Sequence, residues 1–306
     1  MKECLICVDA GGTKTEVVGF TLDGKEIAKH IGGSGNFAFD AKTAVKNIFS
    51  AVETVYEEIK NDYEPLIIQM GISGYGAYKD KEGLIHQFQS YFNTTVHIVD
   101  DARLALYSIL KDQHDEGVLI LAGTGSACFG IKGEESLLIG GWGHLLGDEG
   151  SAHHLVLQTF KLMITDEDEG RPARPIAIKM LEHLGLDNTF DLKQYVYGHT
   201  KAEVASNSQY INELAEQGDE DAIKLLVQSG HYLAKHVELM VQRLALKEDV
   251  IIGCQGSFIL NSKTVKEAFK EKVYSFNPQA IIHDKPERPV VGAYYLGLRH
   301  INKGVS

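Results

Sequence analysis

The first residues that could do chemistry form a short glycine turn after an apolar strand near the N-terminus. Residues 5–8 are apolar, Asp9 follows them, and residues 10–15 read Ala-Gly-Gly-Thr-Lys-Thr. Adjacent glycines let the backbone approach a ligand closely, and successive amide N–H groups in such a turn form a concave site that suits phosphate. Asp9 could hold a hydrated Mg²⁺ beside that phosphate, because Mg²⁺ keeps several waters and uses few carboxylates. The alternative is an ordinary hairpin in which Asp9 only helps to form the turn.

The same pattern recurs in the middle of the chain. Residues 118–121 are apolar and lead into residues 122–126, which read Ala-Gly-Thr-Gly-Ser. As after the first turn, two strand-like segments joined by a hairpin turn follow. This repetition predicts an internal duplication, with two similar domains that each offer a Gly-Thr phosphate turn and face each other across a cleft. Chance similarity of two glycine-rich hairpins is the weaker alternative, since each stands at the head of its half.

A candidate proton acceptor lies at the end of another apolar strand. Residues 96–99 read Val-His-Ile-Val, which suits a buried strand, and are followed by Asp100 and Asp101, after which residues 102–110 have a helical pattern. A carboxylate at a strand end and helix start is stabilised by the helix N-terminus and can accept a proton from an attacking hydroxyl. The alternative is that Asp101 is only a helix N-cap, and the residues taken alone favour that alternative.

Hydrophobic patterning predicts the elements that position these residues. In the first half, strands are expected at residues 5–8, 16–20, 26–31, 66–71 and 96–99, and helices at 44–59, 84–91 and 102–110. This order predicts a mixed sheet with helices on its faces. In the second half, strands are expected at 118–121, 127–131, 137–139, from 250 and near 280–283, and helices at 155–163, 175–184, 192–197, 201–217, 221–244, from 264 and at 290–301.

Composition limits the classes of function. The chain has 306 residues, of which 44% are hydrophobic, and this length predicts two domains with sizeable cores. A net charge of −12 argues against a nucleic-acid or anionic-membrane partner, which would be repelled. No signal peptide and no apolar run of membrane-spanning length occur, so a cytoplasmic location is expected. The four cysteines lie in apolar runs and are expected to be buried thiols, with Cys4 and Cys7 on opposite faces of one strand.

Familiar nucleotide and hydrolase motifs are missing. There is no complete G-x-x-x-x-G-K-[ST], and no complete G-x-G-x-x-G follows a strand, since Gly123-x-Gly125 has Cys128 in the last place. Neither H-E-x-x-H nor G-x-S-x-G occurs. The sequence therefore supports neither a P-loop nor a Rossmann site, and a hydrolase is disfavoured.

Taken together, the motifs resemble those of one known family. They are the two glycine turns, Asp100-Asp101-Ala102, the stretch from Gly141 to Ser151, and Gly253-x-x-Gly256. In this order they resemble the BadF/BadG/BcrA/BcrD group of the actin-like ATPase and sugar kinase superfamily, with the greatest likeness to N-acetylglucosamine kinases. The resemblance covers essentially the whole chain. Its most specific element is Trp-Gly-x-x-x-Gly-Asp-Glu-Gly-Ser, which begins at Trp142.

The resemblance implies an α/β fold and a division into domains. Two ribonuclease H-like (actin-like ATPase) domains with mixed sheets flanked by helices are expected, with a ligand cleft between them. The first domain would span residues 1–115, with the C-terminal helix 290–306 packing back on it. The second would span residues 116–289 and carry a helical insertion.

The resemblance also implies an activity. It is that of an ATP-dependent kinase that transfers the γ-phosphate to the 6-hydroxyl of an amino sugar, most simply N-acetylglucosamine, with ATP and Mg²⁺ as cofactors. Asp101 would be the catalytic base, and Asp9 would hold Mg²⁺ through water. The amino sugar and ATP are the expected ligands, a homodimer is the expected assembly, and neither nucleic acid nor membrane is an expected partner.

Other site residues follow from the same resemblance. The expected phosphate-binding residues are Gly11, Gly12, Thr13, Lys14, Gly123, Thr124, Gly125 and Ser126. The expected adenosine-binding residues are Gly253, Gly256 and Ser257, and the expected sugar-binding residues are Asn36, Asp101, Gly143 and Asp148. Solvent exposure of Lys14 and a turn-forming role of Asn36 are the alternatives. Trp142 is expected to pack in the core or on a cleft wall, and Glu149 could cap the helix that begins near Ser151.

One departure from the family pattern leaves the sugar open. Where related kinases usually have an Asn after the second turn, this chain has Ala127. Glucosamine and N-acetylmuramic acid are therefore alternative substrates by the same mechanism. An ATPase that activates a dehydratase is a second class, although it needs exposed cysteines for an iron–sulfur cluster. A sugar-responsive regulator is a third, although the chain has no DNA-binding extension and the wrong charge.

Overall fold

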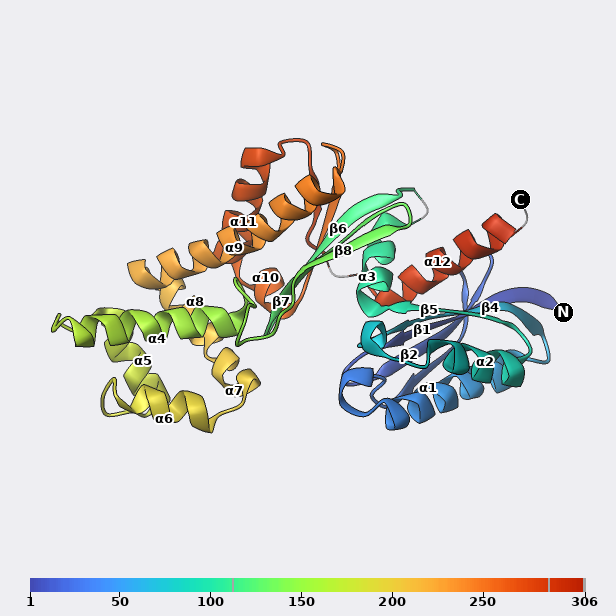
Figure 1. Cartoon of the computed structure of the whole chain (residues 1–306), viewed down its shortest axis with the longest axis horizontal. Helices are drawn as coiled ribbons and strands as arrows, with labels where there is room; N and C mark the ends of the chain where they lie inside the picture. Colours follow the sequence, from blue (N-terminus) through green and yellow to red (C-terminus); the bar gives the residue numbers. More distant parts are fainter. Residues whose placement is uncertain (112, 286, 305–306) are drawn as a thin grey trace. The chain divides into compact units, whose positions relative to one another are not determined.

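The computed structural model describes residues 1–111, 113–285 and 287–304, and the chain divides into two compact units. Unit 1 contains residues 1–115 and the C-terminal segment from Glu287, and unit 2 contains residues 116–286. Each unit is built around its own five-stranded sheet (Figure 1).

The sheet of unit 1 is mixed. Its strands are β1 (Lys2–Ala10), β2 (Thr15–Thr21), β3 (Glu26–Gly32), β4 (Tyr63–Ile72) and β5 (Thr95–Asp100), in the order β3-β2-β1-β4-β5. The first three strands form an antiparallel meander, whereas β1, β4 and β5 run parallel. Helices α1 (Phe37–Ile59) and α2 (Lys81–Phe92) pack on one face, and α3 (Asp101–Leu110) and α12 (Pro289–Gly304) on the other (Figure 1). A short 3₁₀ helix (Tyr75–Ala77) follows β4.

Strand β1 is buried on both faces, as its continuous apolar run predicts. Cys4, Ile6 and Val8 belong to the core under α1 and α2. Leu5 points to the opposite face, where its Cδ2 would lie 2.6 Å from a Cβ built on Gly297 of α12. The four cysteines of the chain are all buried as free thiols, which confirms the sequence-based interpretation.

The sheet of unit 2 repeats this topology. Its strands are β6 (Glu116–Ala122), β7 (Ser126–Lys132), β8 (Glu135–Gly140), β9 (Ile251–Gln255) and β10 (Ile281–His283), in the order β10-β9-β6-β7-β8. Again three strands form an antiparallel meander, and the other two continue the sheet in parallel with the first strand. The predicted α/β fold with two mixed, helix-flanked sheets is therefore confirmed, including its repetition.

The remaining helices belong to unit 2. They are α4 (Ala152–Asp168), α5 (Pro175–Leu184), α6 (Asp191–Gly198), α7 (Lys201–Ser206), α8 (Ser208–Glu216), α9 (Glu220–Leu244), α10 (Ser257–Asn261) and α11 (Lys263–Phe276). Helix α9 packs across β6, β7 and β8, and α11 packs on α9. Helices α4, α7 and α8 form a further layer next to α9 (Figure 1).

Several helices differ from the sequence prediction. The single helix expected over residues 201–217 is broken at Asn207, whose Nδ2 donates to the Val204 carbonyl oxygen (3.0 Å) at the end of α7. Helix α1 begins seven residues before the predicted Ala44, because Asn36 caps it and a kink at Asp40 interrupts its apolar period. Helix α10 was not predicted, since five residues are too short for a helical period to show.

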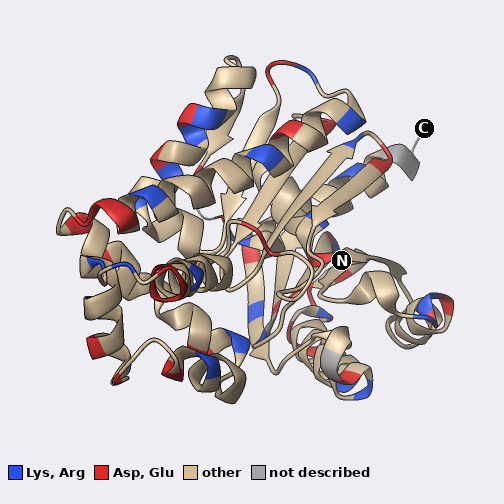
Figure 2. Cartoon of the chain, turned by 60° about the vertical axis from the view of Figure 1, so that its left-hand side comes forward, with Lys and Arg blue, Asp and Glu red and all other residues tan. Residues whose placement is uncertain are grey.

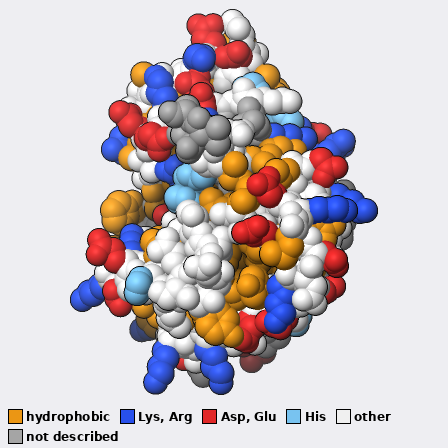
Figure 3. All heavy atoms as spheres, turned by 90° about the vertical axis from the view of Figure 1, so that its right-hand side faces the viewer, with side chains coloured by type: hydrophobic (Ala, Val, Ile, Leu, Met, Phe, Trp, Pro, Cys, Tyr) orange, Lys and Arg blue, Asp and Glu red, His pale blue; other side chains and the backbone are white. Residues whose placement is uncertain are grey.

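Charged residues of both signs are mixed along the helices of both units (Figure 2). On the face shown in Figure 3, side chains of both charges are interspersed with exposed apolar side chains. Within the described part of the chain, no helix combines the length and the apolarity that crossing a membrane requires.

The packing of α12 on α3 gives a test of the fold. A Cβ on Gly292 of α12 would lie 1.8 Å from the carbonyl oxygen of Leu104 and 2.7 Å from the amide nitrogen of Ser108. We expect Gly292→Ala to lower the free energy of unfolding by about 1–3 kcal/mol, because backbone cannot move aside as a flexible side chain can. Gly198→Ala is the control, since a Cβ there meets nothing within 4 Å. Urea unfolding followed by circular dichroism measures both, and equal stabilities would contradict the packing described.

Candidate active site

In unit 1, the two carboxylates that the sequence predicts for the active site, Asp9 and Asp101, lie at one edge of the sheet. The parallel strands β1, β4 and β5 pair so that Ala10 lies beside Ile72, and Ile72 beside Asp100. Asp9 therefore stands near the end of β1, and Asp101 directly follows the end of β5. In open α/β sheets, ligands bind outside the carboxyl ends of the parallel strands. The structure thus brings Asp9 and Asp101 to the edge where a ligand is expected.

The first glycine turn closes tightly between β1 and β2. Gly11 donates its N–H to the Lys14 carbonyl oxygen (2.9 Å), and its own carbonyl accepts from Gly35 (3.0 Å). Gly12 and Thr13 are exposed at the tip. The side chain of Lys14 is 58% exposed, and its Nζ lies 3.9 Å from Glu16 Oε2. Lys14 is therefore exposed to solvent, which the sequence analysis gave as the alternative to phosphate binding.

Asn36 has the turn-forming role that the sequence analysis gave as the alternative to sugar binding, which stays a prediction. Its Oδ1 accepts the backbone N–H of Ala38 (2.8 Å) and caps α1, so it does form a local capping turn. Its Nδ2 lies beside the glycine turn, 3.8 Å from where a Cβ of Gly12 would be. One side-chain atom therefore fixes the helix start, while the other lies next to the proposed phosphate turn.

The two carboxyl groups at this edge, those of Asp9 and Asp101, both have raised pKa values. Burial, together with the charges of Asp101 and Glu16, raises the pKa of Asp9 to about 6, against an opposing effect of Lys14. Burial also raises the pKa of Asp101 above its usual range, and the charge of Asp100 adds to this, although Ser73 and the Ala102 N–H (2.9 Å) donate hydrogen bonds to it. Carboxylates that are costly to ionise favour a nearby cation or an incoming proton.

In unit 2, the second glycine turn is tied to the loop that precedes α4. Gly123 donates its N–H to the Gly125 carbonyl oxygen (3.0 Å) and accepts from Ala152 (3.0 Å). Ser126 donates its hydroxyl to the Glu149 carbonyl oxygen (2.7 Å). The turn and the loop of residues 141–151 therefore form one hydrogen-bonded assembly.

Asp148 lies at the centre of this assembly. It is 3% exposed and has a left-handed backbone (φ 64°), a conformation that is uncommon for a residue other than glycine. Its Oδ1 accepts the N–H of Ser126 (3.3 Å), and its Oδ2 accepts from Lys201 Nζ (2.6 Å). Gly143, also in this loop, has φ 82° and accepts the N–H of Gly147 (2.8 Å).

Two expectations for this loop need correction. Trp142 is 74% exposed, so it does not pack in the core of unit 2, and its place on a cleft wall stays a prediction. Glu149 is not the cap of α4. That cap is Ser151, whose Oγ accepts the N–H of His154 (3.1 Å).

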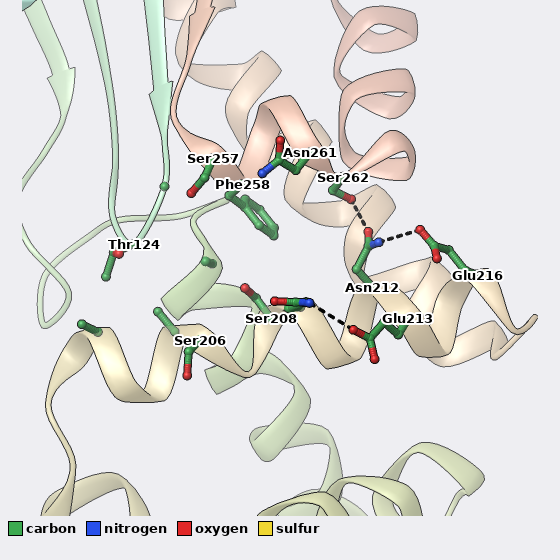
Figure 4. A pocket seen from close by; sticks show the side chains of 15 residues that line it. Thr124, Ser206, Ser208, Asn212, Glu213, Glu216, Ser257, Phe258, Asn261 and Ser262 are labelled. Atoms are coloured by element: carbon green, nitrogen blue, oxygen red, sulfur yellow. Dashed lines mark hydrogen bonds between the residues drawn. The ribbon is translucent and has the colours of Figure 1, made fainter.

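A pocket of about 660 Å³ lies beside the second turn. Gly123 and Thr124 form one side of it, Ser257 and Phe258 at the start of α10 another, and α7 and α8 the floor (Figure 4). The part of the floor that comes from α8 is polar, and its residues include Gln209, Asn212, Glu213 and Glu216. This volume is in the range of small-molecule and cofactor sites.

The three predicted adenosine residues have different places around this pocket. Ser257 lines it directly. Gly256 has φ 105°, and a Cβ on it would lie 2.4 Å from the Ala122 carbonyl oxygen, so glycine is required for α10 to start this close to β6. Gly253 is buried within β9, where it pairs with Leu119, and is not part of the pocket wall. The residues of α7 and α8 that line the pocket belong to none of the sequence motifs, so the sequence did not predict their place at this site.

The donor set for a metal ion is sparse. The described residues contain no cluster of three or more His, Cys, Asp and Glu side chains that could hold a metal ion. Asp9 lies at a partly buried edge with other carboxylates near it. This arrangement fits a hydrated Mg²⁺ held by few carboxylates and by ligand phosphates, which is how Mg²⁺ usually binds.

Comparison with known proteins identifies the family to which the chain belongs. Residues 6–297 match the BadF/BadG/BcrA/BcrD ATPase family. The chain belongs to this family. The resemblance seen in the sequence motifs is therefore confirmed.

Curated relatives in this family are amino-sugar kinases by name. The N-acetylmuramic acid/N-acetylglucosamine kinase of Clostridium acetobutylicum is 28% identical over 87% of this chain and 89% of its own length. The N-acetyl-D-glucosamine kinase of Dictyostelium discoideum is also 28% identical, over 97% of this chain and 98% of its own. A solved Chromobacterium violaceum structure, titled as that of a proposed N-acetylglucosamine kinase, has a TM-score of 0.65 at 19% identity and covers 97% of this chain and 99% of its own. This last likeness shows the shared fold.

The raised pKa of Asp9 predicts a dependence of stability on pH. Below the ordinary value of 3.8, Asp9 is protonated in the folded and unfolded states alike. Between about pH 4 and 6 the unfolded state ionises first, so this carboxyl costs stability as the pH rises, and above about 6 the full cost is present.

We therefore expect Asp9→Asn to raise the free energy of unfolding at pH 7.5 by about 1–3 kcal/mol, and to change it little near pH 3.5. Thermal unfolding at the two pH values measures this. An unchanged or lower melting temperature at pH 7.5 would contradict the electrostatics described.

Proposed function

We propose that this protein is an ATP-dependent kinase that transfers the γ-phosphate of ATP to the 6-hydroxyl of an amino sugar, with N-acetylglucosamine as the first candidate. The observation that carries the proposal is the combination of two glycine turns with the buried carboxylate edge of unit 1, in a chain of an ATPase family. The names of the curated relatives support the amino sugar as the acceptor.

The proposed chemistry begins with the acceptor hydroxyl. Its oxygen forms a bond to the γ-phosphorus, the bond to the ADP oxygen breaks, and the hydroxyl proton passes to Asp101. Burial raises the pKa of Asp101, which makes this carboxylate a better proton acceptor than an exposed one. Mg²⁺, when bound, supplies positive charge that offsets the charge of the phosphates, and Asp9 would hold it through water.

Each glycine turn has a proposed role in binding the phosphates. The residues assigned to this role are Gly11, Gly12, Thr13 and Lys14 in unit 1, and Gly123, Thr124, Gly125 and Ser126 in unit 2. In unit 2 the pocket next to the turn would take the adenosine, with Ser257 at the start of α10 on one side. The polar side chains of α8 can pair with ribose hydroxyls and purine nitrogens, which need donors and acceptors on their edges (Figure 4).

The proposed sugar contacts are Asn36, Asp101, Gly143 and Asp148. Ala127 stands where an Asn is usual and sits on β7, so it offers no side-chain amide to an acetamido group. Glucosamine and N-acetylmuramic acid therefore stay as alternatives, and the name of the Clostridium relative includes N-acetylmuramic acid. An iron–sulfur ATPase activator is disfavoured, because the four thiols are buried. The homodimer stays a prediction.

A sugar panel tests this function. We expect purified protein with Mg-ATP to release ADP when N-acetylglucosamine, glucosamine or N-acetylmuramic acid is added, as followed by a coupled assay. The ranking of the three sugars by kcat/KM gives the substrate. If no amino sugar stimulates ADP release above the level without sugar, the proposal is wrong.

Replacing the proposed base separates catalysis from binding. We expect Asp101→Asn to lower kcat by about 10²–10⁴-fold, the range for loss of a general base, while the dissociation constant of the sugar changes little. The matched control is Asp100→Asn, because Asp100 is the adjacent carboxylate and makes no side-chain capping bond. We expect it to keep kcat within about tenfold of wild type. Equal activity of Asp101→Asn and wild type would remove Asp101 from this role.

A further inference from the structure

An ion pair next to the second glycine turn contains a lysine, Lys201, that has no proposed role. Lys201 Nζ lies 2.6 Å from Asp148 Oδ2, and the side chains are 30% and 5% exposed. The two residues are 53 positions apart in the sequence, and Lys201 belongs to none of the motifs.

The pair fixes the orientation of the Asp148 carboxylate. A buried carboxylate without partners would be strongly destabilising, because it loses its hydration. Here each oxygen has a donor, the N–H of Ser126 on Oδ1 and Lys201 on Oδ2. Two donors from two different segments leave the carboxylate little freedom to rotate.

Gly125 of the turn makes room for this arrangement. A Cβ at this position would lie 2.8 Å from Lys201 Nζ and 2.9 Å from Asp148 Oδ2. Both distances are too short for a carbon atom that cannot hydrogen-bond, so the pair is pressed against the backbone of the turn. A Cβ at residue 125 would therefore force the side chains of Lys201 and Asp148 to shift.

The helix that carries Lys201 is itself held in place. Lys201 is the first residue of α7, and Thr200 and Glu203 form a capping box at this helix start. The N–H of Thr200 donates to Glu203 Oε2 (2.7 Å), and the N–H of Glu203 donates to Thr200 Oγ1 (3.3 Å). Helix α7 also packs on α4, so the stem of Lys201 starts from a fixed backbone.

We propose that Lys201 is a positioning residue that holds the Asp148 carboxylate ready to accept hydrogen bonds from the sugar. This inference rests on the proposed function, in which Asp148 contacts the sugar. Lys201 acts through Asp148 and does not touch the reacting atoms. Its loss should therefore weaken sugar binding and leave ATP binding largely intact.

The test uses the variants Lys201→Met and Lys201→Arg. Trp142 is the only tryptophan of the chain and lies on the same loop as Asp148, so its fluorescence can report binding of N-acetylglucosamine without turnover. For Lys201→Met we expect the dissociation constant and the KM of the sugar to rise by at least about tenfold, since one partner of a buried pair is removed. The KM of ATP should stay within about twofold of wild type. Lys201→Arg, which keeps the charge, should recover most of the sugar affinity.

A second lysine provides a matched control. Lys179 Nζ lies 3.8 Å from Asp219 Oδ2, and the side chain of Asp219 is 4% exposed, as expected for a buried helix cap. Both residues are in unit 2, and neither lines the pocket. Lys179→Met should therefore affect stability without changing the KM of the sugar. If Lys201→Met does not fold, as judged by circular dichroism, Lys201→Gln replaces it, because glutamine keeps a donor but not the charge.

The outcomes separate this inference from the function on which it rests. A wild-type protein that neither binds nor phosphorylates any amino sugar overturns both. A wild type that phosphorylates the sugar, with a folded Lys201→Met that has the same sugar KM, overturns the positioning role alone. A rise confined to the KM of ATP also overturns it, because Lys201 would then be a phosphate contact.

Discussion

The edge of the unit 1 sheet depends on one electrostatic constraint, the crowding of partly buried carboxylates. Asp9 and Asp101 are brought there because β1, β4 and β5 run parallel and end together. Burial and like charge both raise the pKa of Asp9 to about 6. Such an arrangement costs stability, and its natural explanation is a ligand that brings positive charge or a proton. The cap that Asn36 provides for α1 and the packing of α12 on α3 hold this edge in shape.

Unit 2 uses the same topology for a different electrostatic result. Its carboxylate, Asp148, is more deeply buried than Asp9, yet it has a cation and a backbone donor on its two oxygens. The glycine turn beside it opens onto a pocket with polar walls. The duplicated sheet therefore carries a site with excess negative charge in unit 1 and a compensated site with a pocket in unit 2. This division fits chemistry in the first unit and nucleotide binding in the second.

The sequence predicted what depends on short-range patterns. Apolar runs identify buried strands because both faces of β1 and β6 are covered, and the repeated order of runs and turns predicts the repeated topology. The break at Asn207 escaped prediction, because its side chain also bonds with Tyr195 and His183 of other helices, and these contacts are set by tertiary packing. The sequence could not predict the ion pair of Lys201 with Asp148, since tertiary packing brings these two residues together. The exposure of Trp142 was not predicted, because an aromatic residue in a loop has no period from which its burial can be inferred.

Transfer of a phosphoryl group from ATP to the 6-hydroxyl of an amino sugar can be followed by phosphorus NMR of the products formed from Mg-ATP and N-acetylglucosamine. We expect a phosphomonoester signal split into a triplet by the two protons on C6, with an equal amount of ADP. A doublet, which indicates a secondary hydroxyl, or inorganic phosphate as the sole new product, would contradict this transfer.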